Sequence, residues 1–248
     1  MKCMNCGFSV ETPYCGQCGQ EAASGKVTLA EMRRTALRAF SLERGWLHTV
    51  VDLSIRPGPM IRAYLDGKRV IYIGPVRYAI TLNSLYIVLA TLLGPAALGL
   101  QSTEGGAEYE RNASVFFQQY GTPLLLLAAP LYAAASWLLF RRRGLAFSEH
   151  LAVILFVLGH SAIVYAVGGL VAALVPEHLA AIWSAMFVIG VVYYAWVLCG
   201  VCAGNAWTAI GGALVVQAVG FAATTVLGIV GFAAYLFLRW FFTDASPI

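Results

Sequence analysis

Five long stretches with almost no charge constrain this chain more than any other feature. A membrane-crossing helix needs about 20 apolar residues to span a hydrocarbon core about 30 Å thick. Five segments of the 248-residue chain fit that length. Overall, 60% of the residues are hydrophobic and 11% are charged, whereas a soluble domain carries about a quarter charged residues. The sequence therefore predicts an all-α polytopic membrane protein with a five-helix transmembrane bundle, whose spans cover residues 78–100, 122–140, 148–175, 179–202 and 208–238.

Local signals refine the ends of these spans. Pro123 suits the first turn of the second helix, where its missing N–H costs nothing, and Ser148 suits the N-cap of the third. The fifth segment would be about 46 Å long as one helix, which exceeds the hydrocarbon core. Such a helix must tilt, protrude or break. A break would fall at Gly211-Gly212, and protrusion on the cytosolic side is the interpretation that we favour.

The charges divide the chain and predict its orientation. Residues 1–78 hold eleven Lys or Arg and six Asp or Glu, whereas residues 79–248 hold five and six. Cytoplasmic loops of membrane proteins are enriched in Lys and Arg, so the basic N-terminal third and the three arginines at 141–143 should face the cytosol. Five spans then place the C-terminus outside. The predicted domains are a zinc ribbon (1–25), amphipathic helices (26–77) and the transmembrane domain (78–248).

Four cysteines near the N-terminus have the spacing of a zinc site. The chain reads CMNCG and CGQCG, with eight residues between the two pairs. Each CxxC turn can aim two thiolates at one metal ion, and four thiolates fill the tetrahedral coordination of zinc. A cytosolic location disfavours disulfides as the alternative. The sequence predicts one structural Zn²⁺ bound by Cys3, Cys6, Cys15 and Cys18.

The predicted ribbon carries few charges, namely Lys2 and Glu11, with Glu21 after its cysteines, so the absence of a basic face disfavours nucleic acid as its partner. Docking of a cytosolic protein, or clamping of the following helices, fits better. A third pair, Cys199 and Cys202, ends the fourth span. Its simpler interpretation is small packing residues, and the alternative is a redox or auxiliary metal pair.

Residues 26–77 read as amphipathic helices at the membrane surface, including stretches at 43–55 and 59–65. A basic residue near an anionic leaflet contributes about 1 kcal/mol of binding free energy. We therefore expect a site for anionic lipid head groups, with a plain topogenic anchor as the alternative. The candidate lipid- or anion-binding residues are Arg56, Arg62, Lys68 and Arg69.

From Arg56 the chain reads RPGPMIRAYLDGKRVIYIGPVRY. Together with the two CxxCG pairs, this resembles a family of uncharacterised bacterial membrane proteins. Its members join an N-terminal zinc ribbon to an RPGxxIRxYLxGKRxxYxxP block and several spans, and the likeness reaches Glu149-His150 and His160. The resemblance implies a bacterial inner-membrane location and supplies no activity, because the domain has no known function. The five-span layout is also loosely similar to Yip-type membrane proteins.

Ionisable residues inside spans are costly and often functional, and the third span carries Glu149, His150 and His160. Glu149 and His160 share a helix face about 16 Å apart, which excludes joint coordination of one metal. Two interpretations of His160 stay open. It could be a neutral histidine bonded to Ser, Thr, Tyr or Asn of neighbouring helices. A proton or solute path would instead be lined by His160, Asn83, Gln217 and Thr224.

The chain contains no P-loop, dinucleotide-binding fingerprint, HExxH or nucleophile elbow, so no catalytic residue is assigned. The predicted function is a non-catalytic membrane scaffold or regulator whose ribbon docks a partner. The alternatives are a transporter or lipid-handling protein with a path near His160, and a membrane enzyme that uses Glu149, His150 and His160. The glycine-rich last two spans indicate close helix packing or a homo-oligomer.

Overall fold

The computed structural model describes residues 2, 7–9, 11–17, 44–68, 71–94, 108–203 and 205–241. The chain divides into two compact units, Met1–Arg44 and Gly45–Ile248. In the first unit, Lys2 and Ser9 form an isolated antiparallel β-bridge. The predicted amphipathic helix that precedes residue 43 lies outside the described residues, and the predicted domain boundaries after residues 25 and 77 stay predictions.

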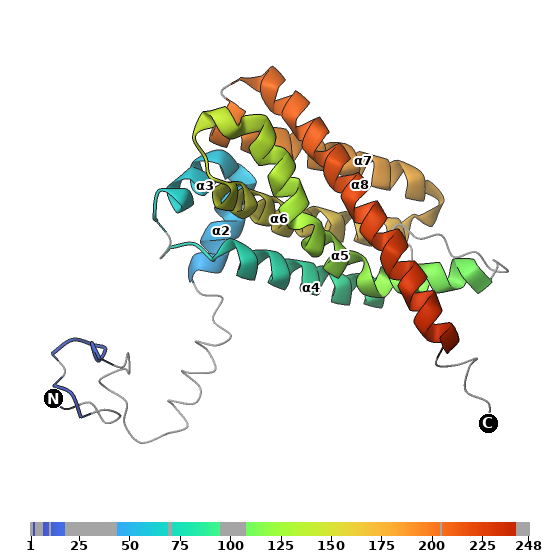
Figure 1. Cartoon of the computed structure of the whole chain (residues 1–248), viewed down its shortest axis with the longest axis horizontal. Coiled ribbons are helices and arrows are strands. Elements are labelled where there is room, and N and C mark those ends of the chain that lie inside the picture. Colours follow the sequence, from blue (N-terminus) through green and yellow to red (C-terminus); the bar gives the residue numbers. More distant parts are fainter. Residues whose placement is uncertain are drawn as a thin grey trace. The chain divides into compact units, whose positions relative to one another are not determined.

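The regular elements described in the second unit are all helical (Figure 1). Their order is α2 (Arg44–Ile55), α3 (Pro57–Leu65), α4 (Pro75–Leu93), α5 (Glu108–Phe140), the 3₁₀ turn η2 (Arg141–Arg143), α6 (Phe147–Leu174), the 3₁₀ turn η3 (Pro176–His178), α7 (Leu179–Leu198), the π-helical turn η4 (Cys199–Ala203) and α8 (Ala206–Arg239).

Five helices among the described residues are long and apolar enough to cross a membrane. Their outward surfaces are apolar, as the exposed Leu85, Val88 and Leu92 of α4 illustrate. This confirms the prediction of an all-α protein with five helices whose length and composition suit a membrane span. The five helical segments are Pro75–Leu93, Gln119–Arg143, Phe147–Leu174, Pro176–Cys202 and Ala206–Arg239.

The predicted start of the second spanning helix was wrong. The helix of the second span begins at Glu108, so Pro123 lies inside it, as does Pro130. Membrane helices tolerate internal proline because neighbouring helices and local adjustments satisfy the freed backbone groups. Of the alternatives for the last span, a break at Gly211-Gly212 is absent, because α8 runs unbroken through both residues. A helical glycine costs only about 1 kcal/mol relative to alanine, whereas a break in lipid would leave backbone polar groups without partners.

The bundle is organised by two extended helix pairs, α4 along α6 and α5 along α8. A Cβ atom at Gly159 would lie 2.7 Å from the ring of Tyr78, and one at Gly220 would lie 1.9 Å from the ring of Tyr132. Glycine at these positions lets an aromatic ring of the neighbouring helix lie against the backbone. Small residues allow such close approach in membrane bundles.

Helices α2 and α3 lie at one end of the bundle, which we call the arginine end. Here α4 and α6 begin, and here lie Arg141–Arg143 and η4. Figure 1 shows α2 and α3, in blue, beside this end. The ring of Tyr64 on α3 meets that of Phe156 on α6 edge to face, with centroids 5.1 Å apart. The segment at 44–65 therefore packs against the arginine-end portions of α6 and α7.

The backbones of α3 and η4 touch at two glycines. Helix α3 begins at Pro57, two residues before the predicted start, which puts Gly58 in its first turn. A Cβ atom on Gly58 would lie 2.5 Å from the Cα atom of Gly200. One turn further on, Arg62 donates a 2.8 Å hydrogen bond to the carbonyl of Val201. A cation at the C-terminal end of a helix is favourable, so α3 both covers and caps the end of α7.

We expect Gly58→Ala and Gly200→Ala each to lower the free energy of unfolding by about 1–3 kcal/mol, the usual cost of overpacking. The reason is that each new methyl group would meet backbone atoms, which cannot rotate away. Thermal melting of the purified protein in detergent measures the effect. Gly211→Ala is the matched control, because its methyl group would meet nothing within 4 Å. Melting of Gly58→Ala at the wild-type temperature would contradict the contact.

Candidate functional site

His160 joins three other elements of the bundle. Its Nδ1 lies 3.0 Å from the hydroxyl of Tyr78 on α4, and its Nε2 lies 3.3 Å from the hydroxyl of Ser54 on α2. The ring stacks on that of Tyr193 on α7, with centroids 5.1 Å apart. His160 is only 6% exposed, so both ring nitrogens are engaged within a buried cluster. We call Ser54, Tyr78, His160 and Tyr193 the His160 cluster.

The His160 cluster lies close to the arginine end. His160 is near the middle of α6 in sequence, about 20 Å along the helix from Phe147. Tyr78, its partner, belongs to the first turn of α4. His160 is therefore level with the beginning of the first span and with the end of α2, and not with the middle of the first span. The arginine-end half of α6 is covered by α2 and α3.

Further hydrogen bonds attach α2 to its surroundings. The hydroxyl of Tyr193 donates to the carbonyl of Leu53 at 3.2 Å. The buried hydroxyl of Thr49 accepts a 3.0 Å hydrogen bond from the amide of Ile73 and donates to the carbonyl of Gly45. These bonds satisfy polar groups that would otherwise be buried without partners. They hold both the middle and the end of α2.

Asp52 forms a second set of polar contacts on α2. Its two carboxylate oxygens accept 3.0 Å hydrogen bonds from Arg56, and one of them also accepts a 2.8 Å bond from the hydroxyl of Tyr72. Burial alone would raise the pKa of the Asp52 carboxyl, but the bonds from Arg56 and Tyr72 outweigh it and lower that pKa below its usual value. Burial and the neighbouring carboxylate raise the pKa of Tyr72. We call these three residues the Asp52 clamp.

The structure shows three of the four basic residues predicted to bind lipid or anions. Arg56 belongs to the Asp52 clamp, although its side chain is 62% exposed. Arg62 donates to the carbonyl of Val201, and Lys68 is exposed. Arg69 lies outside the described residues. The common site of these four residues stays a prediction.

Glu149 and His150 take part in contacts separate from the His160 cluster. The carboxylate of Glu149 accepts a 2.7 Å bond from the amide of Ala146, the N-cap of α6. The predicted cap, Ser148, is therefore wrong, because the helix begins one residue before it. His150 is fully buried, with Nδ1 2.9 Å from the hydroxyl of Ser136. Its Nε2 has no hydrogen-bond partner among the described residues.

The polar residues proposed to line a path through the membrane lie in different helix interfaces. The amide of Asn83 donates to the carbonyls of Ala79 and Leu158, between α4 and α6. Gln217 and Thr224 belong to α8, which packs on α5 and α7. The hydroxyl of Thr224 donates to the carbonyl of Gly220 in its own helix. These contacts do not join the four residues into one chain of hydrogen bonds.

Of the four cysteines predicted to bind zinc, the structure describes only Cys15, which is 2% exposed. Cys3, Cys6 and Cys18 lie outside the described residues, so the zinc site stays a prediction. Within the part of the chain that the structure describes, no three His, Cys, Asp or Glu side chains are placed to share a metal ion. Cys199 and Cys202 flank Gly200 at the contact with α3, and Cys202 is buried.

A cavity that the sequence did not indicate lies in the half of the bundle away from the arginine end. It has a volume of about 410 Å³, and all five spanning helices contribute to its wall. Most of its side chains are aromatic or aliphatic, with hydroxyl groups as the polar ones. We call it the aromatic pocket, and its lining includes Tyr86, Leu125, Tyr165, Trp183 and Phe221.

Sequence reasoning predicted the kinds of residue that bond His160, but it did not identify Ser54 or Tyr78, and it missed the Asp52 clamp. One signal for the clamp was present, because Asp52 and Arg56 are four residues apart on a helix and such pairs face each other. No comparable signal pointed to Ser54 or Tyr193. The aromatic pocket had none either, because its wall combines single residues from five helices.

Comparison with known proteins covers α2, α3 and most of α4. Residues 43–87 match the model of a family described as "Protein of unknown function (DUF3667)". The match includes the Asp52 clamp, Ser54 and Tyr78, and it ends before His160. No curated protein and no solved structure matches the chain. Residues 43–87 are therefore a DUF3667 domain of unknown function, carried by a protein with five helices suited to cross a membrane.

Proposed function

We propose that the protein is a non-catalytic scaffold or regulator of the bacterial inner membrane, in which the DUF3667 segment is fastened to the bundle and presents the N-terminal unit to a partner. One observation carries this proposal. His160 is the ionisable residue within the spans that a proton path would use. Both of its ring nitrogens are engaged in hydrogen bonds that hold α2 and α4. A neutral imidazole in this role crosslinks helices, as polar side chains do in membrane bundles.

Zinc binding by the four N-terminal cysteines is part of the proposal. Three described features are compatible with a zinc ribbon. Lys2 and Ser9, which flank the first cysteine pair, are paired in an antiparallel bridge. Gly7, directly after that pair, has a φ angle of +75°, which favours glycine. Cys15 is buried. A Cys₄ site would fold this segment and leave no open coordination position for catalysis.

The proposed orientation has the N-terminus and the arginine end in the cytosol and the C-terminus outside. The basic residues Arg77 and Arg141–Arg143 lie at the arginine end, as the positive-inside rule requires. Anionic lipid head groups would then meet the candidate site of Arg56, Arg62, Lys68 and Arg69. A cytosolic protein is the proposed partner of the ribbon, and self-association through the last two spans is the proposed route to a homo-oligomer.

The aromatic pocket favours a second function, the handling of a small apolar molecule. Its volume falls in the range of small-molecule sites, which are mostly apolar with a few polar groups. His160 does not line it. A transport or lipid-handling path would therefore pass through the aromatic pocket and not beside the imidazole.

We expect the purified protein to hold one zinc ion per chain, measured by elemental analysis. Cys15→Ser should lower the zinc content, because it removes one of four ligands. Cys199→Ser is the control, since it changes a cysteine outside the predicted ribbon. Wild-type metal content in Cys15→Ser, or loss of zinc in Cys199→Ser, would contradict the ribbon.

Substitution of His160 separates a fastening role from a proton path. His160→Gln keeps a donor and an acceptor and should leave stability nearly unchanged. His160→Leu loses both hydrogen bonds and should lower the free energy of unfolding by about 1 kcal/mol, since such bonds average about 0.6 kcal/mol in membranes. Thermal melting measures stability, and complementation of a strain lacking the gene measures function.

Tyr78→Phe is the matched variant, because it removes one partner of His160 and keeps the ring. Combined with His160→Leu, it should cost less than the two separate effects added together, since both remove the same bond. Loss of complementation by both His160 variants at unchanged melting temperature would favour the proton path instead, because neither side chain titrates near neutral pH.

The Asp52 clamp predicts a dependence of stability on pH. The pKa of Asp52 is lowered in the folded protein, so its stabilising effect is complete above its unfolded value near 4 and is lost as the pH falls further. Asp52→Asn should therefore cost about 1 kcal/mol at pH 7 and progressively less below about pH 4. Melting curves of both proteins from pH 7 to pH 3 measure this difference. A difference that stays constant over that range would contradict the clamp.

A further inference from the structure

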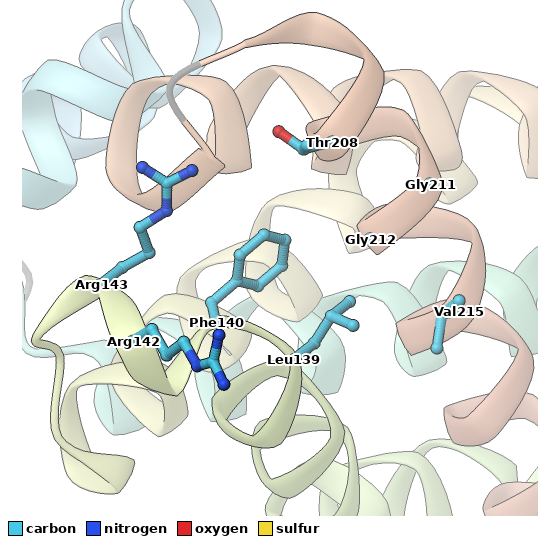
Figure 2. Close-up of a pocket in the computed structure, with 8 residues that line it drawn as sticks. All are labelled: Leu139, Phe140, Arg142, Arg143, Thr208, Gly211, Gly212 and Val215. Carbon is cyan, nitrogen blue, oxygen red and sulfur yellow. The ribbon is translucent and has the colours of Figure 1, made fainter.

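A pocket with two arginines lies at the arginine end, between the end of α5 and the first turns of α8 (Figure 2). Its volume is about 480 Å³. Arg142 and Arg143 come from the turn after α5, and Thr208 and Gly211 come from α8. No residue that lines the pocket is acidic. We call it the basic pocket.

Two adjacent glycines of α8 give the basic pocket its shape. A Cβ atom at Gly212 would lie 2.4 Å from the ring of Phe140, so this glycine lets the ring lie against α8 and form an apolar wall. A Cβ atom at Gly211 would meet nothing within 4 Å. Figure 2 shows both glycines on the turn of α8 that faces Phe140. One glycine therefore accommodates the ring, and the other leaves the pocket open.

The polar groups of the basic pocket are suited to an anion. Among the described residues, no hydrogen bond or ion pair engages Arg142, and its side chain is exposed. The start of α8 is already capped, because Asn205 accepts hydrogen bonds from the amide and the hydroxyl of Thr208. The guanidinium group of Arg142, and not the helix end, is thus the group that attracts a ligand. Arginine binds phosphate oxygens through charge-assisted, often bidentate, hydrogen bonds.

An apolar groove continues from the basic pocket along α5 and α8. Leu139 and Val215 line both cavities. The groove has a volume of about 520 Å³ and extends for about 12 Å along α5, between Leu131 and Leu139. Its wall on α8 ends at Ala223, and no charged residue lines it. We call it the apolar groove.

The surroundings place the basic pocket at a membrane surface. Trp207, in the first turn of α8, is 84% exposed, and exposed tryptophan is enriched at the interface between lipid and water. The apolar groove runs from this level into the spanning part of α5 and α8. A basic pocket at the interface, continuous with an apolar groove inside the bilayer, matches the two chemical parts of a phospholipid.

We infer that the basic pocket and the apolar groove together bind one anionic phospholipid. Its phosphate contacts Arg142 in the basic pocket, and one acyl chain lies along the groove between α5 and α8. This site is separate from the candidate site of Arg56, Arg62, Lys68 and Arg69, and it does not depend on the scaffold function.

Lipid binding to the full-length protein in detergent, followed by native mass spectrometry with added phosphatidylglycerol or phosphatidylcholine, tests the inference. Phosphatidylglycerol should bind at least about tenfold more tightly than phosphatidylcholine, and Arg142→Gln should weaken its binding about tenfold, as loss of a charge-assisted hydrogen bond implies. Arg141→Gln is the matched control, because it removes the same charge from a neighbouring position that does not line the pocket.

Gly211→Leu tests the pocket without removing charge. Its side chain would enter the open space, so phosphatidylglycerol binding should fall while the melting temperature in lipid-free detergent stays unchanged. Ala222→Leu adds similar bulk elsewhere, on the exposed surface of the same helix. It should change neither phosphatidylglycerol binding nor the melting temperature. If Arg142→Gln does not fold, Arg142→Lys, which keeps the charge but loses the guanidinium group, replaces it in the binding measurement.

Three results would overturn the inference. Equal binding of the two lipids would mean that the groove holds only acyl chains. Equal weakening by Arg141→Gln and Arg142→Gln would mean that the surface attracts anions without a defined pocket. Binding of inorganic phosphate that Arg142→Gln abolishes, without any lipid preference, would assign the pocket to a free anion instead.

Discussion

The contact between α2 and His160 is the interaction on which the arrangement of the arginine end depends. A buried imidazole nitrogen without a partner costs about 1–3 kcal/mol, so the two hydrogen bonds of His160 matter for stability. Here Ser54 and Tyr78 supply them, and both belong to the DUF3667 segment. The third span therefore cannot satisfy its own histidine. The ring nitrogens of His160 have hydrogen-bond partners only when α2 and the start of α4 are packed against α6.

The DUF3667 segment is also held at α3, by a different kind of contact. Gly58 and Gly200 bring two backbones together, and Arg62 then reaches the carbonyl of Val201. The arginine-proline-glycine sequence and the CGVC sequence, which looked like unrelated features, meet at this point. Proline at the first turn lets α3 begin directly after Arg56, so Arg56 is free to pair with Asp52. One short segment thus carries two fastenings with different physical origins.

What could be predicted from the sequence follows from what the bilayer imposes. Five spans were predictable because lipid leaves backbone groups no partner except their own helix. Helix ends such as that of α5 were not, because Pro123 suits a first turn and an interior position equally in lipid. Gly211 and Gly212 were possible sites of a break, whereas the role of Gly212 depends on Phe140, a residue about 70 positions away. Of the polar site, His160 and the kinds of residue that would bond it could be predicted, and the spacing of Asp52 and Arg56 was a signal for the clamp. The partners of His160 come from three other helices and have no local signature.

The lengths of the helices explain why an interfacial lipid site arises on α5 and α8. Helix α4 is about 28 Å long and matches the hydrocarbon core, whereas α5 and α8 are each about 50 Å long. A helix longer than the hydrocarbon core must tilt or extend beyond it. Figure 1 shows α8 crossing the bundle obliquely. Oblique antiparallel helices diverge away from their crossing point, which leaves a groove on the lipid-facing side. Glycine at 211 leaves that groove open where the arginines follow α5. A lipid molecule seated there would fill the space that helix length and tilt create.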